Sequence, residues 1–551
     1  MGGTGGVREK WILAVDLGNG GPKVARVALD GTILGTAFRP VDVHIGLDGS
    51  ATQDAGQWWD RLIEAAREVI DGADAGALHA VAITGQWGST VPVGFDSEPV
   101  GPALLWADTR ARDLVQPLIG GPINVGGYAP HKALPFIRLA AGAPNTDGAD
   151  PTGHALLLKT RFAEIYSRTA TLLEPVDYLG LRFTGRVAAT PASMTLSWLT
   201  NHRPGAEPGY VDALIARTRR DRAKLPELLP TGSVLGPLLP SVAEGLGLAP
   251  GAPVVCGLPD LHAAVLGSGA VAPYATHVAI STTAWIGARV PFKRTDLFHS
   301  IATVPGLDPT LPIVANNHET GGAALQWLRD RILRAPPAEQ TPGAATGSGT
   351  TGPDIAMASN GVTPGPSFEE MTAWAAGAPA GSEGLLFTPW LSGERSPVDD
   401  KHLRGGWLNL SLRTDRAALV RSVMEGVAYN MRWLFDPYQR FLRRRVESVR
   451  ILGGGAVSDL WCQLHADIMG CHVERVADPQ QAQLRGVALW ARICLGELTI
   501  DDARRLVPVA DRFDPQPENR AVYAAGYAEF RRLAGTLKGF YHRTNGRSPH
   551  G

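Results

Sequence analysis

Three turns rich in glycine or hydroxyl residues each follow an apolar, strand-like run. They span residues 18–21, 281–283 and 453–455, and Asp16 stands beside the first. Such turns bring backbone amides close to anionic oxygens, and a helix that starts after the third turn adds its dipole. One turn alone is weak evidence, because glycine commonly ends strands. Three of them beside an aspartate favour a nucleotide-binding protein.

The nucleotide site predicted by these turns is of an uncommon kind. The chain contains no Gly-x-x-x-x-Gly-Lys-Ser/Thr and no Gly-x-Gly-x-x-Gly in a Rossmann setting. Asp16 ends its strand where a carboxylate can hold magnesium through water. Lys23, on the next strand, can reach phosphates as a point charge. We therefore expect a phosphate and magnesium site at the first turn.

A phosphoryl transfer also needs a base near the acceptor hydroxyl. The stretch GLPDLHAA supplies Asp260, at the junction of the two halves of the chain. The alternative is that Asp260 caps the helix that follows it. The two roles are compatible, so the local sequence leaves both open.

The elements that must position these residues are of mixed type. From Trp11 the chain predicts three short antiparallel strands, then a helix that starts near Asp54, then a further strand over LHAVAITGQ. Residues 276–290 again predict a strand, a polar turn and a strand. We infer a mixed α/β protein whose second half is built on the plan of the first.

Composition bounds the class of protein. A chain of 551 residues is longer than a single hydrophobic core usually accommodates, which favours two large domains. A net charge of -1 with 19% charged residues makes nucleic acid and anionic membranes poor partners. No apolar run approaches the roughly 18 residues of a membrane span. Four cysteines and a start unlike a signal peptide lead us to expect a cytoplasmic protein.

Eight blocks, in order, give the chain a recognisable pattern. They are AVDLGNGGPKVA, AITGQWGST with LLWADTRAR, LLEPVDYLGLRFTGR, VVCGLPDLHAAVLGSGAV, GGAALQWLRD, LLFTPWLSGERSPV, LSLRTDRAALVRSVMEGVAY and LGGGAVSDLWCQLHADIMG. In these blocks the chain resembles the FGGY carbohydrate kinases, and among them the xylulokinases, over nearly its whole length. The resemblance implies two actin-like, ribonuclease-H-like α/β domains that flank an active-site cleft.

The resemblance also implies where the domains lie. We expect an N-terminal domain over residues 10–268, on the sugar and magnesium side, and a C-terminal domain over 269–505, on the adenine side. A loop rich in Pro, Gly, Ala, Ser and Thr is inserted at about 335–354. Residues 506–551 are expected to form a C-terminal helix and tail. A homodimer is compatible with this plan.

Roles for individual residues follow from the resemblance. Asp260 corresponds to the base that takes the proton from the sugar hydroxyl, and Asp16 to the residue that organises Mg²⁺. The expected contacts to ATP are Gly18, Asn19, Lys23, Thr282, Thr283, Gly454, Gly455 and Asp459. The expected contacts to sugar, besides Asp260, are Gln86, Trp87, Gly88, Trp106 and Asp108. Without the resemblance, the residues alone favour a core position for Trp106.

The chain departs from the family pattern at several of these positions. Asn19 stands where the family has Thr or Ser, and Ser281 and Asn409 stand where it has Gly. Asparagine tolerates a left-handed turn, and its amide can donate to phosphate. Ser281 adds a side chain where the backbone approaches the nucleotide. Trp87 and Gly88 replace the Arg-Glu pair of glycerol kinases and the Met-His pair of xylulokinases, which disfavours glycerol and alters the sugar contacts.

Two classes of function remain from the sequence. The first is an ATP- and magnesium-dependent kinase for a ketose or polyol, with D-xylulose as the leading substrate and ribulose, sedoheptulose or an erythritol-type polyol as alternatives. The second is a sugar- or nucleotide-binding sensor of the same fold that has lost catalysis. The presence of both Asp16 and Asp260 favours the kinase.

Overall fold

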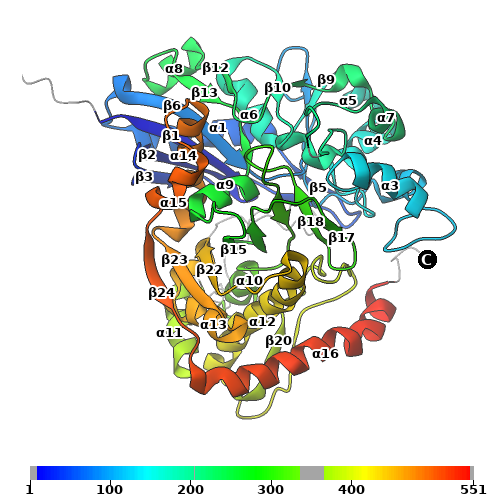
Figure 1. Ribbon diagram of the computed structural model, residues 1–551, viewed down its shortest axis with the longest axis vertical. Helices are drawn as coiled ribbons and strands as arrows, with labels where there is room; N and C mark the ends of the chain where they lie inside the picture. The colour runs from blue at the N-terminus through cyan, green and yellow to red at the C-terminus, as the bar shows by residue number, and fades with distance from the viewer. Residues whose placement is uncertain (1–8, 204, 335–364, 547–551) are drawn as a thin grey trace, which may run out of the picture.

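The computed structural model describes residues 9–203, 205–334 and 365–546. Its two largest β-sheets, one in each half of the chain, have helices packed around them (Figure 1). The loop expected at about 335–354 lies outside the described residues. The predicted mixed α/β class is confirmed.

The first sheet begins with the predicted meander. It is built on β1 (Trp11–Gly18), β2 (Gly21–Ala28), β3 (Ile33–Phe38) and β6 (Leu78–Gly85). β2 is antiparallel to both β1 and β3, whereas β6 is parallel to β1. The sheet also contains β12 (Val234–Pro237), β13 (Pro253–Val255) and β14 (Leu258–Pro259). The strands lie in the order β12-β13-β6-β1-β2-β3, and β14 pairs with β6 outside this order. Every residue of β1 except Gly18 is buried, which fits its apolar run.

The second sheet repeats this arrangement. β15 (Thr276–Ile280) and β16 (Ala284–Ala288) form an antiparallel hairpin, and β22 (Ser448–Leu452) pairs parallel to β15 as β6 does to β1. β23 (His472–Val476) and β24 (Val509–Phe513) complete the order β16-β15-β22-β23-β24. The shared pattern supports the predicted internal repeat. Because β24 lies after residue 505, the second sheet extends beyond the boundary expected there.

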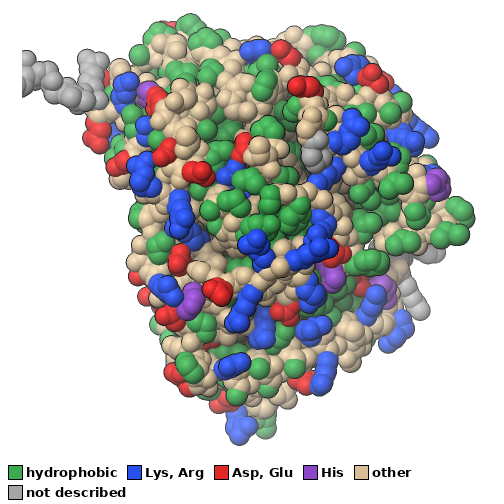
Figure 2. Space-filling model, in the orientation of Figure 1, with side chains coloured by type: hydrophobic (Ala, Val, Ile, Leu, Met, Phe, Trp, Pro, Cys, Tyr) green, Lys and Arg blue, Asp and Glu red, His purple; other side chains and the backbone are tan. Residues whose placement is uncertain are grey.

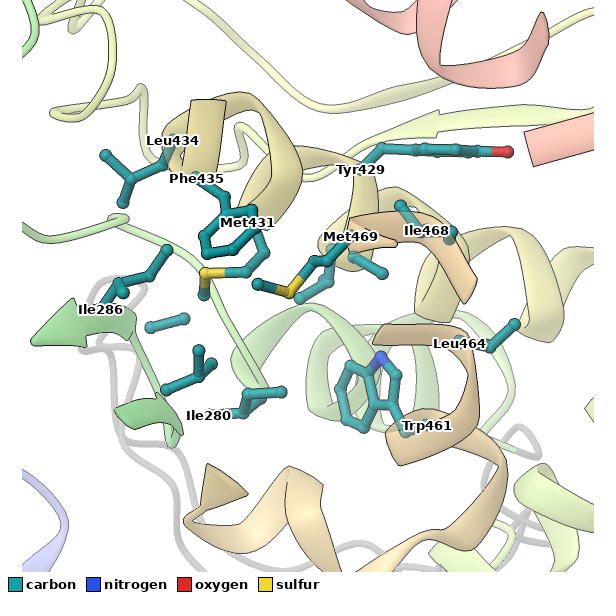
Figure 3. Packing of buried hydrophobic residues seen from close by; sticks show 14 of the residues in the cluster. Ile280, Ile286, Tyr429, Met431, Leu434, Phe435, Trp461, Leu464, Ile468 and Met469 are labelled. Atoms are coloured by element: carbon teal, nitrogen blue, oxygen red, sulfur yellow. The ribbon is translucent and has the colours of Figure 1, made fainter. Parts of the chain in front are cut away.

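Helices cover the two large sheets, and α1 is the helix that the sequence predicts near Asp54. Helix α1 (Ala55–Ile70) starts at Asp54, whose carboxylate accepts from the Gly56 amide at 2.8 Å. In the second half, α11 (Phe368–Gly377), α12 (Arg416–Leu442) and α13 (Asp459–Met469) surround the largest core. Figure 3 shows side chains of α12 and α13 packed toward Ile280 and Ile286 of the second sheet.

Two helices cross between the halves and join them. α9 (Asp260–Ser268) follows the first sheet in sequence but also packs on β15 and β22, while α14 (Ala482–Cys494) follows the second sheet but packs on β1 and β6. In Figure 1, α14 accordingly lies beside the blue strands of the first half. A Cβ atom at Gly267 would overlap the Ala482 carbonyl, and one at Gly486 would overlap the Ala263 carbonyl. Glycine therefore permits the close crossing that holds the two halves together.

Shorter elements complete the described chain. The remaining helices are α2 (Arg112–Ile119), α3 (Pro130–Leu139), α4 (Pro151–Arg161), α5 (Ala163–Arg168), α6 (Pro175–Thr184), α7 (Asp212–Arg217), α8 (Pro240–Leu246), α10 (Ala323–Trp327), α15 (Ala503–Leu506) and α16 (Arg520–Asn545). The remaining strands are β4 (His44–Ile45), β5 (Ala51–Gln53), β7 (Val91–Gly94), β8 (Ala103–Leu104), β9 (Thr169–Leu173), β10 (Ala188–Ala189), β11 (Glu227–Leu228), β17 (Thr295–Asp296), β18 (Ile301–Val304), β19 (Ile313–Ala315), β20 (Leu386–Thr388) and β21 (Gly406–Leu408).

The surface carries charges of both signs. Figure 2 shows basic and acidic side chains distributed over both halves of the visible face. Among the described residues, no helix combines the length and the apolar character that crossing a bilayer requires.

Candidate active site

Asp16 and Asp260 come from distant parts of the chain and flank the end of β6. In the sheet register, Asp16 of β1 and Leu258 of β14 both pair with Thr84 of β6, one on each side. Asp260 follows two residues after Leu258, as the first residue of α9. The parallel pairing of β1, β6 and β14 therefore brings the two carboxylates to the same edge of the sheet.

The electrostatic state of Asp260 reflects this setting. Burial, and in addition the negative charge of Asp16, raise the pKa of Asp260 to about 7. Burial also raises the pKa of Asp16, while the nearby Lys23 ammonium lowers it. A carboxyl group with a pKa near neutrality is suited to accept a proton at physiological pH.

The structure also bears on the helix-capping alternative for Asp260. The N-cap position of α9 is Pro259, and no side-chain cap is formed there. Asp260 Oδ1 instead accepts from the adjacent Leu261 amide at 2.7 Å. One oxygen thus satisfies an amide at the start of the helix, and no described residue donates to Oδ2. Asp260 is therefore the first residue of α9 and not its N-cap, so the helix-capping alternative is wrong.

Asp16 has the properties of a site for a hard cation. Asp16 is only 9% exposed, and no described residue donates a hydrogen bond to its carboxylate. A buried carboxylate with oxygens to spare fits Mg²⁺, which commonly takes one or two carboxylates and fills its other positions with water and phosphate. The described residues form no cluster of three or more protein ligands, so such an ion would depend on water and substrate for the rest of its shell.

The first turn connects β1 to β2 and depends on one glycine. Gly21 has a φ of +134°, and a Cβ atom there would overlap the Arg39 carbonyl. Gly18 pairs with Gly21 to close the hairpin. Lys23 extends toward the other half of the chain, where its Nζ donates to the Gln480 carbonyl at 3.0 Å. Its predicted contact with phosphate stays a prediction.

Asn19 is held by its neighbours in a way that its sequence did not predict. Asparagine tolerates a left-handed turn, but the positive φ in this turn falls on Gly21 and not on Asn19. The side-chain Oδ1 of Asn19 accepts from Trp106 Nε1 at 2.9 Å. Its backbone carbonyl accepts from Gln53 Nε2 at 2.8 Å. Asn19 is therefore fixed by hydrogen bonds to Trp106 and Gln53, and not by a left-handed backbone conformation.

The second turn joins β15 to β16 and meets the start of α10. Backbone amides of Gly321 and Gly322 donate to the carbonyls of Thr282 and Ser281, at 2.9 and 2.6 Å. Thr282 is exposed and Thr283 half-buried. Ser281 does not have a positive φ, so a side chain is tolerated there. Asn409, the other residue that replaces a family glycine, has a φ of +70°, which asparagine adopts more readily than most residues.

The third turn separates β22 from α13. Gly453 has a φ of +95°, and a Cβ atom there would lie 2.5 Å from the Ile280 carbonyl oxygen. Gly454 is exposed with open space around it, whereas Gly455 packs against Ile280. Asp459, the first residue of α13, forms an ion pair with Arg475 at 2.6 Å. The sheet order places this turn beside the second turn, because β15 and β22 are neighbours.

The expected sugar residues 86–88 follow directly after β6. Gln86 Nε2 donates to Gln53 Oε1 at 3.2 Å, and Trp87 Nε1 donates to the Ser193 carbonyl at 2.9 Å. The Trp87 ring also stands edge-on to His262 of α9, two residues after Asp260, with 5.6 Å between ring centroids. These contacts place residues 86–88 beside the start of α9.

Gly88 needs its lack of a side chain. Its φ is +84°, and a Cβ atom would lie 3.0 Å from Leu196 Cδ1. Its amide donates to Glu174 Oε2 at 3.0 Å. Burial, and next the charge of Asp177, raise the pKa of Glu174 well above its ordinary value. Sequence reasoning passed over Glu174, although an acid directly before Pro175 at a helix start marks it.

The two remaining sugar candidates lie in different surroundings. Trp106 is half-buried and reaches Asn19, and the Arg395 guanidinium lies 5.8 Å from its ring centroid. Asp108 is fully buried, and both of its oxygens accept from Arg110, while Oδ2 also accepts from the Ala51 amide. The structure thus brings Trp106 to the first turn and commits Asp108 to protein contacts.

Comparison with known families agrees with this geometry. Residues 11–126 match the model of the FGGY family of carbohydrate kinases, N-terminal domain, and residues 306–494 match that of its C-terminal domain. Together the two matches cover more than half of the chain. The chain belongs to the FGGY family of carbohydrate kinases. It is therefore a sugar kinase, and kinases of this family use ATP.

Relatives of this FGGY kinase act on more than one substrate. It is 24% identical over 534 residues to the xylulose kinase of Staphylococcus epidermidis, across 94% of this chain and 95% of that protein. It is 27% identical over 504 residues to the erythritol kinase of Brucella abortus, across 89% of each. A ligand-bound xylulose kinase from Lactobacillus acidophilus has the same fold, with a TM-score of 0.78 at 19% identity, over 97% of this chain and all of that one. The predicted two-domain, actin-like fold is confirmed.

Proposed function

We propose that this FGGY kinase transfers the γ-phosphate of ATP, with Mg²⁺, to a hydroxyl of a ketose, with D-xylulose as the first candidate. The observation that carries the proposal is the pair of carboxylates at the end of β6, where burial and Asp16 raise the pKa of Asp260 to about 7. A base of this strength is matched to a sugar hydroxyl that loses its proton as the bond to phosphorus forms.

Each part of the site has a task in this reaction. Asp260 accepts the hydroxyl proton on Oδ2, because Oδ1 is held by the Leu261 amide. The three turns supply backbone amides to the phosphates. Asp16 would hold Mg²⁺, which would supply positive charge next to the phosphates. The ring of Trp87 contacts His262 of α9, next to Asp260.

The choice of substrate rests on the relatives and on residues 87 and 88. The extent of the likeness to xylulose kinases favours a ketopentose. Gly88 leaves its position without a polar side chain, and a larger residue would clash with Leu196. A site that lacks one hydrogen-bonding side chain shifts its preference among polyols. The likeness to an erythritol kinase makes a tetritol the second candidate.

The test is a substrate panel assayed for ADP release by the full chain with MgATP. The panel contains D-xylulose, D-ribulose, sedoheptulose, erythritol, gluconate and glycerol. We expect the highest kcat/KM with D-xylulose and little turnover of glycerol. Turnover of erythritol alone would move the assignment to the tetritol. Binding of sugar and ATP without product from any of the six would contradict the kinase proposal and support a sensor.

A further inference from the structure

The hydrogen bond between Asn19 and Trp106 fixes which way the Asn19 amide points. An indole N–H can only donate, so Trp106 Nε1 must face the amide oxygen of Asn19, as it does at 2.9 Å. The Nδ2 group of Asn19 is consequently turned away from Trp106. No described residue accepts a hydrogen bond from Nδ2, and the side chain is half-buried in the first turn. Two donor protons are thus presented at the turn.

We propose that Trp106 orients the Asn19 amide so that Nδ2 donates to a phosphate oxygen of the bound nucleotide. Trp106 is then a positioning residue for the phosphate turn, in addition to any contact it makes with sugar. This inference rests on the proposed function, because it takes the first turn to be a phosphate site.

The geometry explains why an amide serves where a hydroxyl is usual. An amide has an acceptor and a donor on opposite sides of one group, so it can bond Trp106 and phosphate together. A threonine hydroxyl stands one atom closer to the backbone and reaches phosphate without a link to Trp106. The nucleotide affinity conferred by Asn19 therefore depends on Trp106, and that conferred by threonine does not.

Trp106 is itself held from both halves of the chain. The Arg395 guanidinium lies 5.8 Å from the centre of its ring, and Arg395 Nε donates to Glu319 Oε1 at 2.9 Å. The backbone amide of Trp106 donates to Oγ of Ser89 at 3.2 Å. Ser89 directly follows the expected sugar residues 86–88. A change in the position of Trp106 would therefore change the orientation of the Asn19 amide.

The test measures the dissociation constant of a non-hydrolysable ATP analogue with Mg²⁺ by calorimetry. Four full-length proteins are compared: wild type, Trp106→Phe, Asn19→Thr and the double variant. We expect Trp106→Phe to weaken binding by about 3- to 10-fold in the Asn19 background, the effect of one hydrogen bond. In the Asn19→Thr background, the same change should alter binding by less than about twofold.

Equal effects of Trp106→Phe in the two backgrounds would overturn the inference, as would an unchanged affinity of Trp106→Phe itself. A merely structural role of Trp106 would weaken both backgrounds alike. Trp106→Leu, which also lacks the indole N–H, replaces Trp106→Phe if the latter fails to fold. A wild-type chain that binds the analogue but phosphorylates no sugar contradicts the proposed function and leaves this test decisive. Failure of the wild type to bind the analogue contradicts both.

Discussion

Asp16 and Asp260 lie on opposite sides of β6, and the charge of Asp16 helps to raise the pKa of Asp260. β6 pairs in parallel with β1 on one side and with β14 on the other, so 243 intervening residues separate two carboxylates that share one edge of the sheet. Burial and the charge of Asp16 raise the pKa of Asp260 to about 7. Such an arrangement is costly for folding and useful for proton transfer.

Asp260→Asn should abolish turnover while making the protein more stable. Removal of a general base lowers kcat by about 10²- to 10⁴-fold. The raised pKa means that the folded state binds the Asp260 proton more tightly than the unfolded state does. The stability that the protonated Asp260 contributes is therefore lost as pH rises from about 4 to 7. At pH 8 the free energy of unfolding of Asp260→Asn should exceed that of the wild type by about 1–3 kcal/mol. Initial rates and denaturant unfolding at pH 8 measure the two effects.

The exposed Asp212→Asn is the matched control, because Asp212 lies in α7 and, among the described residues, forms an ion pair with Arg222 alone. It should change neither the rate nor the stability by much. Retention of most activity by Asp260→Asn would contradict the assignment of the base.

The rate should depend on pH through the ionisation of Asp260. Only the carboxylate accepts a proton, and its pKa lies well above the 3.9 or so of an unperturbed aspartate. We expect kcat/KM for the sugar to fall about tenfold per pH unit on an acid limb that lies above about pH 5. Rates measured from pH 5 to 9, with stability checked at each pH, test this. A profile that stays flat down to pH 5 would show that another group is the base.

The neighbouring glycines of the third turn should respond differently to alanine. Gly453→Ala places a side chain at a φ of +95° and 2.5 Å from the Ile280 carbonyl oxygen, which should cost roughly 1–3 kcal/mol of folding free energy. Gly454→Ala meets open space and should leave stability within about 0.5 kcal/mol. If Gly454 faces the nucleotide, its alanine variant should raise the KM for ATP. Thermal unfolding and ATP kinetics separate the two roles.

His277→Leu should stabilise the protein at acidic pH. His277 is fully buried in β15, neither ring nitrogen has a hydrogen-bond partner among the described residues, and burial lowers its pKa to about 3. Between about pH 3 and 6.5 the unfolded chain binds a proton that the folded chain does not, so stability falls as pH drops through this range. The change in the free energy of unfolding caused by His277→Leu should be about 2 kcal/mol more favourable at pH 5 than at pH 8. An unchanged pH dependence of denaturant unfolding would contradict this.

Local sequence was sufficient for the elements whose signals lie within a few residues. The strand and turn pattern after Trp11, the Asp54 cap of α1 and the hairpin over residues 276–290 were all predicted, because alternation, capping and glycine turns act over short distances. The blocks shared with FGGY kinases identified the family and the two aspartates in the same way.

Only the tertiary structure decided which residues meet. Asn19 looked like a turn residue, yet its distinguishing contact is with Trp106, 87 positions away. Asp108 was expected at the sugar, yet it is enclosed by Arg110 and the Ala51 amide. Glu174 gave a weak local signal, and its carboxylate holds the amide of Gly88. Such contacts depend on strand register and helix crossing, which long-range packing sets and which no short stretch of sequence encodes by itself.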